Sequence, residues 1–310
     1  MESTPAVIGV LVMAYGGPQT LDDVEPYLMD VRGQRPTAPD IIHEVRERYR
    51  EIGGRSPILE QTQAQADALQ KELDASGKRY KVLVGMRHWH PYIADVLAQM
   101  TSAGIQKAVA LAMAPHYSKM SIGAYFQKIA DAKTGIQMAE IAEWHLLPGY
   151  LDALAGRVQS ALLRFPAPIR ARVPILFTAH SLPERILTWG DPYPTQLGET
   201  VSAVMERLGP HPHEFAFQSA AISREPWLGP DAASALTRLA AEGHQDALIA
   251  PIGFVCEHVE ILYDVDIVYQ KLAASLGIHL ERIEMVHTAD PMIKGLAGLV
   301  QQQAKNSGWI

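Results

Sequence analysis

The sequence predicts an α/β protein made of two Rossmann-like halves, each with a four-stranded parallel sheet flanked by helices. The first observation is a set of short apolar runs, several of them continuous, at 6–15, 80–86, 107–115, 138–145, 173–180, 214–219, 247–254 and 279–287. Continuous apolar runs are typical of parallel strands that are buried on both faces. The second observation is that longer amphipathic segments separate the runs, and this alternation favours helices that connect parallel strands.

Helix signals mark the segments between the runs. Four segments end close to a glycine, which commonly follows the last residue of a helix; they span 61–76, 91–103, 231–242 and 258–275. Another begins at Thr20, an N-cap residue type that is followed by two aspartates. The basic stretch 46–50 is interpreted as a solvated helix face, and 209–213 as a loop.

The length of 310 residues corresponds to about two domains at ~150 residues each. Four apolar runs precede residue 150 and four follow it, and Leu147-Pro148-Gly149 is a plausible boundary. We therefore expect an N-terminal domain at 1–149 and a C-terminal domain at 150–310. No repeat is visible in the sequence, so this division rests on the order of the elements.

Composition excludes several classes of protein. The 27 Lys and Arg residues against 34 Asp and Glu give a net charge of −7 without a basic block, which disfavours a nucleic-acid partner. The single cysteine, Cys256, excludes a disulfide framework and an iron–sulfur cluster held within one chain. The glycines of Tyr15-Gly16-Gly17-Pro18 lack the spacing of a dinucleotide fingerprint, and no phosphate-binding loop motif occurs, so no nucleotide is expected.

The N-terminal apolar run predicts neither a membrane span nor a signal peptide. It covers only 6–15, is interrupted by Gly9, and has no Lys or Arg before it. We expect a cytoplasmic protein with no integral membrane segment. Peripheral association with a membrane stays open.

Histidines gather where the predicted strands end. Seven of the twelve lie at or just beyond strand ends: His88, His90, His116, His145, His180, His258 and His287. Ligands of open α/β sheets bind outside the carboxyl ends of the strands, so this pattern indicates metal or proton chemistry. The alternative is that each histidine only caps exposed backbone groups.

Two further loops carry candidate ligand groups. Glu257, Glu260 and Asp264 follow the seventh strand at spacings that place them on one helix face, in a line about 10 Å long. They are either oxygen ligands for a divalent ion or acids that stabilise a helix N-terminus. Arg55 and Ser56 lie in a loop that could hold a carboxylate, although a plain turn is an equally good interpretation.

Three stretches of the chain resemble the ferrochelatase family. They are Phe-Thr-Ala-His-Ser-Leu-Pro-Glu-Arg-Ile at 177–186, Gly-Asp-Pro-Tyr-Pro at 190–194 together with Gln218-Ser219 and Pro-Trp-Leu-Gly-Pro at 226–230, and Gly-Phe-Val-Cys-Glu-His-Val-Glu-Ile-Leu-Tyr-Asp at 253–264. The similarity extends from Val12 to about Asp290. It implies two Rossmann-like, chelatase-like domains around a porphyrin cleft. It also implies insertion of Fe(II), the substrate metal, into a porphyrin with release of two protons, as a step of haem biosynthesis without ATP or redox chemistry.

The resemblance identifies a catalytic pair. The histidine of the Ala-His-Ser-Leu-Pro motif and the glutamate of the His-x-Glu motif face each other across the macrocycle in the family, and they correspond here to His180 and Glu260. Neutral imidazole and carboxylate can both bind the metal and accept pyrrole protons. Which residue delivers iron and which removes protons stays open.

The motif Met-Ala-Tyr-Gly-Gly-Pro at 13–18 resembles the coproporphyrin III ferrochelatases of monoderm bacteria. In them the tyrosine is an axial ligand of the product iron, which implies this role for Tyr15. Further positions match residues that contact the porphyrin or its propionates: Arg32, Arg48, Tyr49, Ser56 and Tyr125. Arg and Ser donors suit the propionate-rich coproporphyrin III. The single cysteine also excludes the C-terminal [2Fe–2S] cluster of some members.

The chain departs from the family pattern at three positions. Gly17 stands where threonine is expected, and Arg87 stands where a lysine is common. Val268 replaces a further acid one turn beyond Asp264, which weakens the prediction of an accessory divalent-ion site at Asp264.

Three alternatives to coproporphyrin ferrochelatase are considered. A protoporphyrin IX ferrochelatase has the same chemistry with a more apolar substrate. A cobalt or nickel chelatase of sirohydrochlorin-type rings is less similar in the 178–183 and 226–230 motifs, and a non-catalytic tetrapyrrole carrier would not need both His180 and Glu260. The expected partners are the porphyrin and, transiently, neighbouring haem-pathway enzymes, and the chain is expected to be a monomer.

Overall fold

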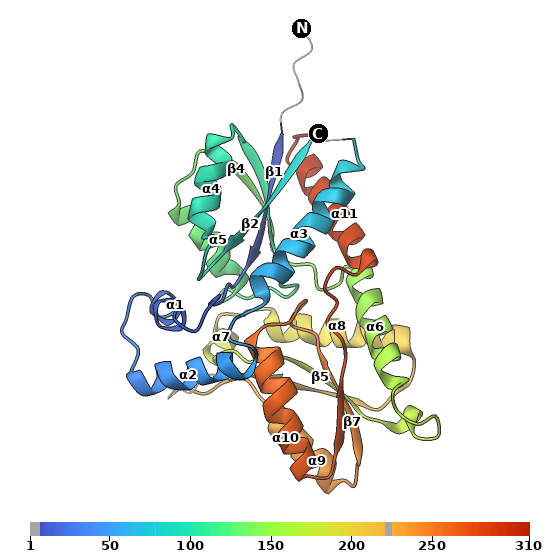
Figure 1. Ribbon diagram of the computed structural model, residues 1–310. Helices are drawn as coiled ribbons and strands as arrows, with labels where there is room; N and C mark the ends of the chain where they lie inside the picture. Colours follow the sequence, from blue (N-terminus) through green and yellow to red (C-terminus); the bar gives the residue numbers. More distant parts are fainter. Residues whose placement is uncertain (1–6, 78, 221–224) are drawn as a thin grey trace. The chain divides into compact units, whose positions relative to one another are not determined.

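Two four-stranded parallel sheets form the framework of the computed structural model, which describes residues 7–77, 79–220 and 225–310 (Figure 1). The first sheet has the order β2-β1-β3-β4 and consists of β1 (Ile8–Ala14), β2 (Tyr80–Met86), β3 (Lys107–Ala112) and β4 (Gln137–Ile141). The second has the order β6-β5-β7-β8 and consists of β5 (Ile175–His180), β6 (His213–Gln218), β7 (Asp246–Pro251) and β8 (His279–Arg282). In each sheet the strand that comes first in the chain is flanked by the second and third. The predicted pair of Rossmann-like domains is confirmed.

Each predicted apolar run contains one strand, but several strands end earlier than the hydropathy suggests. The run at 279–287 contains only β8, yet Met285 and Val286 beyond it are 1% exposed. Buried loop residues are as apolar as strand residues, so hydropathy alone does not mark where backbone pairing stops. Among the described residues, no helix is both long and apolar enough to cross a bilayer.

The chain divides into two compact units that differ from the predicted division at 149/150. Unit 1 comprises 1–114, 119–144 and 287–310, and unit 2 comprises 115–118 and 145–286. The C-terminal helix α11 (Asp290–Asn306) belongs to unit 1 because it packs on α3 (Ile58–Asp74) and on β3 and β4. Leu147-Pro148-Gly149 is the start of helix α6 (Pro148–Leu162) rather than a linker, with Pro148 in the first turn where a missing N–H costs nothing.

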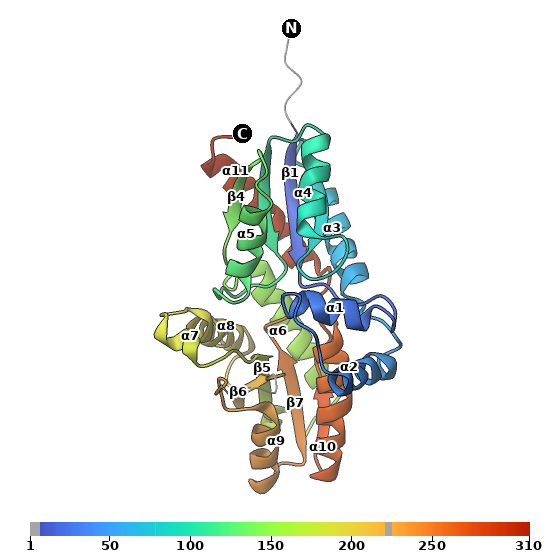
Figure 2. The same cartoon turned by 90° about the vertical axis from the view of Figure 1, so that its left-hand side faces the viewer.

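In unit 1, helices cover both faces of the first sheet. Helices α3 and α11 lie on one face, whereas α4 (Ile93–Ser102) and α5 (Ile122–Asp131) lie on the other (Figures 1 and 2). Helices α1 (Val24–Val31) and α2 (Pro39–Glu51) occupy the connection between β1 and α3. The predicted solvated stretch 46–50 is the last part of α2, where only Tyr49 is buried.

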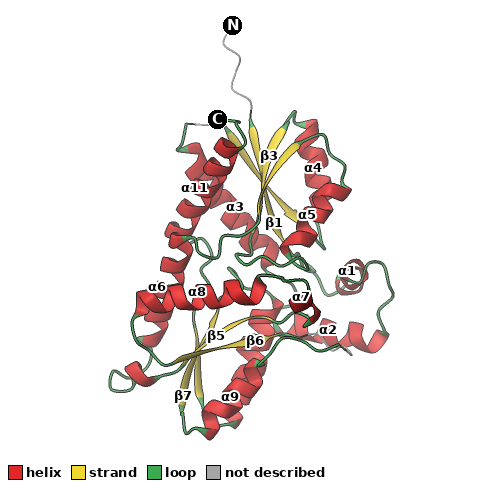
Figure 3. Ribbon diagram, turned by 180° about the vertical axis from the view of Figure 1, so that it is seen from behind, coloured by secondary structure: helices red, strands yellow, loops and turns green. Residues whose placement is uncertain are grey.

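Unit 2 repeats the layered arrangement around the second sheet. Helix α6 packs against β7 and against α8 (Tyr193–Leu208) (Figure 3). The other face carries α9 (Ala232–Ala241), the π-helix η2 (Glu260–Tyr269) and α10 (Gln270–Ser275). Short helical turns complete the unit: α7 (Arg185–Thr188) and η1 (Arg170–Arg172).

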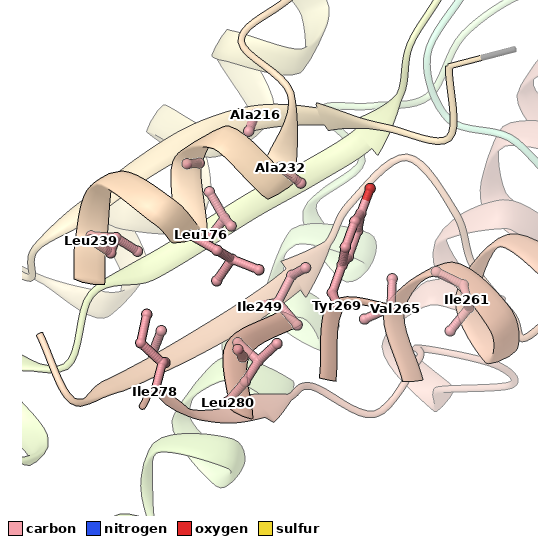
Figure 4. Close-up of a cluster of buried hydrophobic side chains, with 14 of the residues drawn as sticks. Leu176, Ala216, Ala232, Leu239, Ile249, Ile261, Val265, Tyr269, Ile278 and Leu280 are labelled. Atoms are coloured by element: carbon pink, nitrogen blue, oxygen red, sulfur yellow. The ribbon is translucent and has the colours of Figure 1, made fainter. Parts of the chain in front are cut away.

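The core of unit 2 includes one face of its long helical segment, the first part of which is a π-helix. Figure 4 shows side chains of α9, η2 and the strands packed into one cluster. Ile261, Val265 and Tyr269 enter this cluster with a constant step of four residues. The i to i+5 hydrogen bonds of a π-helix widen each turn, so residues four apart share a face. The predicted helix 258–275 is therefore divided into a π-helical first part and an α-helical second part.

His116, which follows β3, lies among several buried polar groups of unit 2. Its Nε2 atom lies 2.8 Å from the Thr200 hydroxyl, and Thr200 in turn donates to the backbone oxygen of Gln196 at 3.1 Å. The Nδ1 atom of His116 is buried without a hydrogen-bond partner among the described residues. Burial, with a smaller contribution from the neighbouring His145, lowers the pKa of His116 to about 3.

We predict that His116 makes stability depend on pH. Its pKa is 6.5 in the unfolded chain and about 3 when folded, so below pH 6.5 the unfolded chain binds the proton first. The stability that the neutral imidazole contributes is complete above pH 6.5 and is lost as the pH falls toward 3. Between pH 6 and 4, the difference in unfolding free energy between wild type and His116→Gln should shrink by about 1.4 kcal/mol per pH unit.

Urea titrations followed by circular dichroism at several pH values measure this difference. His43→Gln is the control at an exposed histidine, because the side chain of His43 is 74% exposed. A difference for His116→Gln that stays constant from pH 7 to 4 would contradict the prediction.

Candidate functional site

His180 and Glu260 meet at the carboxyl edge of the second sheet. His180 is the last residue of β5, and Glu260 begins the π-helix that follows the neighbouring strand β7. Because parallel strands bring their carboxyl ends to one edge, the two side chains approach each other, and Nδ1 of His180 lies 3.1 Å from Oε2 of Glu260. These two atoms are shielded from solvent and have no aligned hydrogen-bond partner in the described parts of the chain. The whole side chains remain 31% and 29% exposed.

The pair favours an imidazolium beside a carboxylate. Burial lowers the pKa of His180, but the negative charges of Glu260 and Asp264 outweigh burial and raise it. Burial raises the pKa of Glu260, but His180 and then His258 outweigh burial and lower it. His258 contributes from the side, with Nε2 3.9 Å from the same Glu260 oxygen. The contact therefore places a protonated imidazole beside a negatively charged carboxylate.

Asp264 lies one π-helical turn beyond Glu260 and is held by Ser219. The Ser219 hydroxyl donates a short hydrogen bond to Oδ2 of Asp264. Ser219 directly follows β6 and has a φ of +60°, an uncommon conformation for a residue with a Cβ atom. The side chain of Asp264 thus has a defined orientation next to the His180–Glu260 pair.

The predicted line of three acids does not form. Glu257 precedes the π-helix, and its carboxylate lies 3.5 Å from the guanidinium of Arg282. Arg282 also binds both carboxylate oxygens of Asp266, at 2.6 and 3.0 Å. The prediction assumed α-helical spacing from Glu257 onward, and that assumption was wrong. Across the described ranges, no three His, Cys, Asp or Glu side chains are close enough together to hold a metal ion.

Tyr15 is the exposed aromatic residue at the carboxyl edge of the first sheet. It follows β1, and its backbone oxygen accepts a hydrogen bond of 2.9 Å from the backbone of His88, which follows β2. The two rings are 4.6 Å apart, and Tyr15 remains 39% exposed. His88 is itself fixed by Asp30, with Nδ1 2.7 Å from Oδ1. Burial outweighs the Asp30 charge and lowers the pKa of His88 to about 4.

Arg87 contacts two aromatic rings at once. Its guanidinium carbon lies 5.7 Å from the ring centres of both Tyr15 and Tyr125, and Nη1 donates to the backbone oxygen of Met120 at 3.2 Å. A planar guanidinium can stack on aromatic faces in a way that a lysine ammonium cannot. The departure from lysine at this position therefore gives Tyr15 a cationic neighbour of fixed orientation.

The two glycines after Tyr15 have separate structural reasons. Gly16 has a φ of +90°, which L residues rarely adopt. A Cβ atom at Gly17 would lie 2.6 Å from both Cβ and Oγ of Ser56 and 3.6 Å from the hydroxyl of Tyr49. Threonine would therefore not fit at position 17 without moving Ser56, which explains the departure from the family motif.

The six residues that the resemblance connects with the porphyrin differ in exposure. Tyr15 and Arg32 are exposed and Arg48 is half-buried, while Ser56, Tyr49 and Tyr125 are 3%, 2% and 5% exposed. Arg32 caps the end of α1, and Arg48 forms a 2.5 Å ion pair with Glu44 on α2. The Ser56 hydroxyl is directed inward, where it accepts a 3.4 Å hydrogen bond from the backbone of Ile58.

The seven strand-end histidines are divided between the two units and differ in their surroundings. His88, His90 and His287 belong to unit 1, and the other four belong to unit 2. Several have partners of their own: His145 lies 2.8 Å from Glu199, and the backbone oxygen of His287 accepts a hydrogen bond from Gln65. Within the described ranges, His180 and His258 are the two of the seven that lie beside Glu260. The interpretation of the seven as one chemical rim stays a prediction.

Comparison with known proteins identifies the family. The chain matches the family model "Ferrochelatase" over residues 7–304. A protein of Herpetosiphon aurantiacus named ferrochelatase is 43% identical over 303 residues, which cover 96% of this chain and 99% of that protein. The chain belongs to the ferrochelatase family of metal chelatases.

Further relatives of this ferrochelatase-family chain carry a more specific name. A coproporphyrin III ferrochelatase of Oceanobacillus iheyensis is 35% identical, covering 96% of this chain and 97% of that protein. Among solved structures, SirB from Bacillus subtilis with Fe3+ matches with a TM-score of 0.59 at 10% identity, covering 98% of this chain and 97% of that one. At this identity the similarity supports the chelatase fold alone.

Sequence reasoning missed the residues that hold the candidate site in place. Tyr193 donates a 2.9 Å hydrogen bond to the backbone oxygen of His180, and Asp30 orients His88. Tyr193 lies within the recognised Gly-Asp-Pro-Tyr-Pro motif, so its motif was visible although its role was not. Asp30 carried no signal, because its contact joins two segments that are far apart in the sequence.

Proposed function

We propose that this ferrochelatase inserts Fe(II) into coproporphyrin III and releases two protons, giving Fe-coproporphyrin III for haem biosynthesis. The choice of coproporphyrin III rests mainly on the position of Tyr15. Its phenol ring is partly exposed and contacts His88 and Arg87. Relatives named coproporphyrin III ferrochelatase support the same choice.

His180 and Glu260 are the proposed catalytic residues. Insertion breaks two pyrrole N–H bonds and forms Fe–N bonds in their place, so the site has to bind a cation and accept protons. Once the proton on His180 has left, an imidazole nitrogen and a carboxylate oxygen 3.1 Å apart offer both functions within one contact. Asp264, oriented by Ser219, adds negative charge that favours the approach of Fe(II).

Tyr15 is the proposed axial ligand of the product iron. A phenol oxygen is a hard ligand that suits iron, and the neighbouring Arg87 favours negative charge on it. Arg32 and Arg48 extend from the ends of α1 and α2 and are proposed to bind propionates through charge-assisted hydrogen bonds. The Arg48–Glu44 ion pair is exposed, so exchanging its partner for a propionate costs little.

Protoporphyrin IX is the second candidate substrate. Ser56 and Tyr49, which resemble propionate-contacting residues, are buried, and the Ser56 hydroxyl is turned toward the start of α3. Fewer available donors would suit a porphyrin with fewer propionates. Relatives from Herpetosiphon aurantiacus and Deinococcus radiodurans, at 43% and 41% identity, are named only ferrochelatase.

The first prediction concerns substrate choice. Purified protein, assayed anaerobically with Fe(II), should consume coproporphyrin III with a higher kcat/KM than protoporphyrin IX. The loss of porphyrin fluorescence measures both rates side by side. A higher kcat/KM for protoporphyrin IX would contradict the proposed substrate but not the insertion of Fe(II). Turnover of neither porphyrin would contradict the proposed reaction and favour a chelatase of another metal or a non-catalytic tetrapyrrole carrier.

The second prediction concerns His180. The His180→Ala variant should lose iron insertion while it still binds porphyrin, because the substitution removes the only imidazole within 3.1 Å of Glu260 among the described residues. Porphyrin binding is measured by fluorescence titration, and insertion by the assay above. His213→Ala is the control, since His213 lies at the opposite end of the same sheet. Wild-type turnover by His180→Ala would remove His180 from the mechanism.

The third prediction concerns Tyr15. The Tyr15→Phe variant keeps the ring beside His88 but lacks the phenol oxygen. The absorption spectrum of the bound product, and its electron paramagnetic resonance spectrum after oxidation to the ferric form with dioxygen, should therefore change. Tyr92→Phe is a matched control, because Tyr92 lies 4.5 Å from the ring of His90 in the same way that Tyr15 lies 4.6 Å from His88. Product spectra identical to wild type in Tyr15→Phe would show that Tyr15 is not an axial ligand.

A further inference from the structure

We propose that Gln218 is a positioning residue for iron insertion, because its buried side-chain amide links the strand that ends in His180 to the helix that begins with Glu260. Gln218 is the last residue of β6 and is 1% exposed. Its backbone is paired with that of His180 in the sheet. The position of Gln218 in the sheet does not by itself indicate a role in iron insertion. The hydrogen bonds of its side chain indicate a positioning role.

Both ends of the Gln218 amide are used. Oε1 accepts a 2.7 Å hydrogen bond from the hydroxyl of Thr178, which lies on β5 and is fully buried. Nε2 donates to the backbone oxygen of Glu260 at 3.3 Å and to the hydroxyl of Ser219 at 3.4 Å. Because the Thr178 hydroxyl donates, it fixes which end of the amide is oxygen and leaves both N–H groups for the other two contacts.

The same links reach the second acid. The Ser219 hydroxyl accepts a hydrogen bond from Gln218 and donates one to Asp264, so the chain of hydrogen bonds runs from Thr178 through Gln218 and Ser219 to Asp264. The positive φ of Ser219 is maintained by these surroundings, as strained conformations near functional sites commonly are. One buried amide thereby sets the first turn of the π-helix relative to β5.

Glutamine is the side chain that this position requires. Methionine fills a similar volume but makes none of the three contacts. A glutamate would keep the acceptor for Thr178 but lose both donors and add a charge near Glu260. The side chain at position 218 must therefore supply one hydrogen-bond acceptor and two donors. Because the position is buried, a polar group left there without a hydrogen bond would lower the stability of the fold.

The consequence for the reaction rests on the proposed function of His180 and Glu260. Removing the link frees Glu260 and Asp264 to shift relative to His180, and a displacement of about 1 Å at reacting groups can lower a rate roughly 100-fold. Gln218→Met should therefore lower kcat by roughly that factor and raise KM for Fe(II). KM for the porphyrin should stay close to wild type, because Gln218 is itself buried.

Four variants test the proposal. Gln218→Met removes the link, Thr178→Val removes its anchor, and Thr178→Ser restores the anchoring hydroxyl. Gln65→Met is the matched control, because Gln65 is also 1% exposed and donates from Nε2 to a backbone oxygen, that of His287 in unit 1. Each variant is assayed for kcat and for both KM values, and thermal unfolding is recorded to compare stability.

Hydrogen–deuterium exchange of the peptide that covers Glu260–Tyr269 supplies a readout that does not need activity. Gln218→Met and Thr178→Val should accelerate exchange in this peptide, while Thr178→Ser and Gln65→Met should not. A fifth variant, which combines Gln218→Met with Thr178→Val, should be no slower in turnover than Gln218→Met alone, because both substitutions break the same chain of contacts.

The outcomes separate the two proposals. Unchanged exchange and unchanged kcat in Gln218→Met would overturn the positioning role, as would an equal loss of kcat in Gln65→Met. Faster exchange together with a selective loss of kcat, reversed in Thr178→Ser relative to Thr178→Val, would support it. If wild type inserts iron into neither porphyrin, the proposed function is wrong. Faster exchange of the Glu260–Tyr269 peptide in Gln218→Met would then support the structural link made by Gln218 and contradict its role in iron insertion.

Discussion

The contact between His180 and Glu260 is the constraint on which the candidate site depends. An imidazole nitrogen and a carboxylate oxygen are held 3.1 Å apart although neither atom has an aligned hydrogen bond. The contact exists because the residues after β7 pass tightly against β5. A Cβ atom at Gly253 would lie 2.8 Å from Cβ of Ala179, so a larger residue there would force the two segments apart.

The backbone around the pair is anchored by side chains that do not belong to the pair. Tyr193 binds the carbonyl oxygen of His180, and Gln218 binds that of Glu260. On the far side, Arg282 binds the carboxylates of Glu257 and Asp266 on either side of the start of the π-helix. These contacts act on main-chain positions or on flanking acids, so they fix the backbone around His180 and Glu260 without engaging the two side chains.

The two units share a strand order but carry different chemistry at their strand ends. Both sheets place the first strand of the unit between the second and third. Unit 2 has an imidazole and carboxylates at this edge, whereas unit 1 has Tyr15 with a cation and a second histidine beside it. The buried strands are constrained by packing on both faces, while the loops that follow them are free to differ. This division explains how one architecture supplies acid and base groups in one unit and aromatic and cationic groups in the other.

The sequence by itself determined the two parallel sheets, because strands buried on both faces must be continuously apolar, as at 8–14 and 247–251. It also determined which residue types stand at the strand ends, including His180 and Tyr15. Only the tertiary structure decided that Glu257 pairs with Arg282, that the Ser56 hydroxyl faces α3, and that α11 joins unit 1. Each of these outcomes depends on contacts between side chains from separate segments or on the packing of one whole element against another. A local pattern of hydropathy or spacing does not determine such contacts, because the contacting residues lie far apart in the sequence.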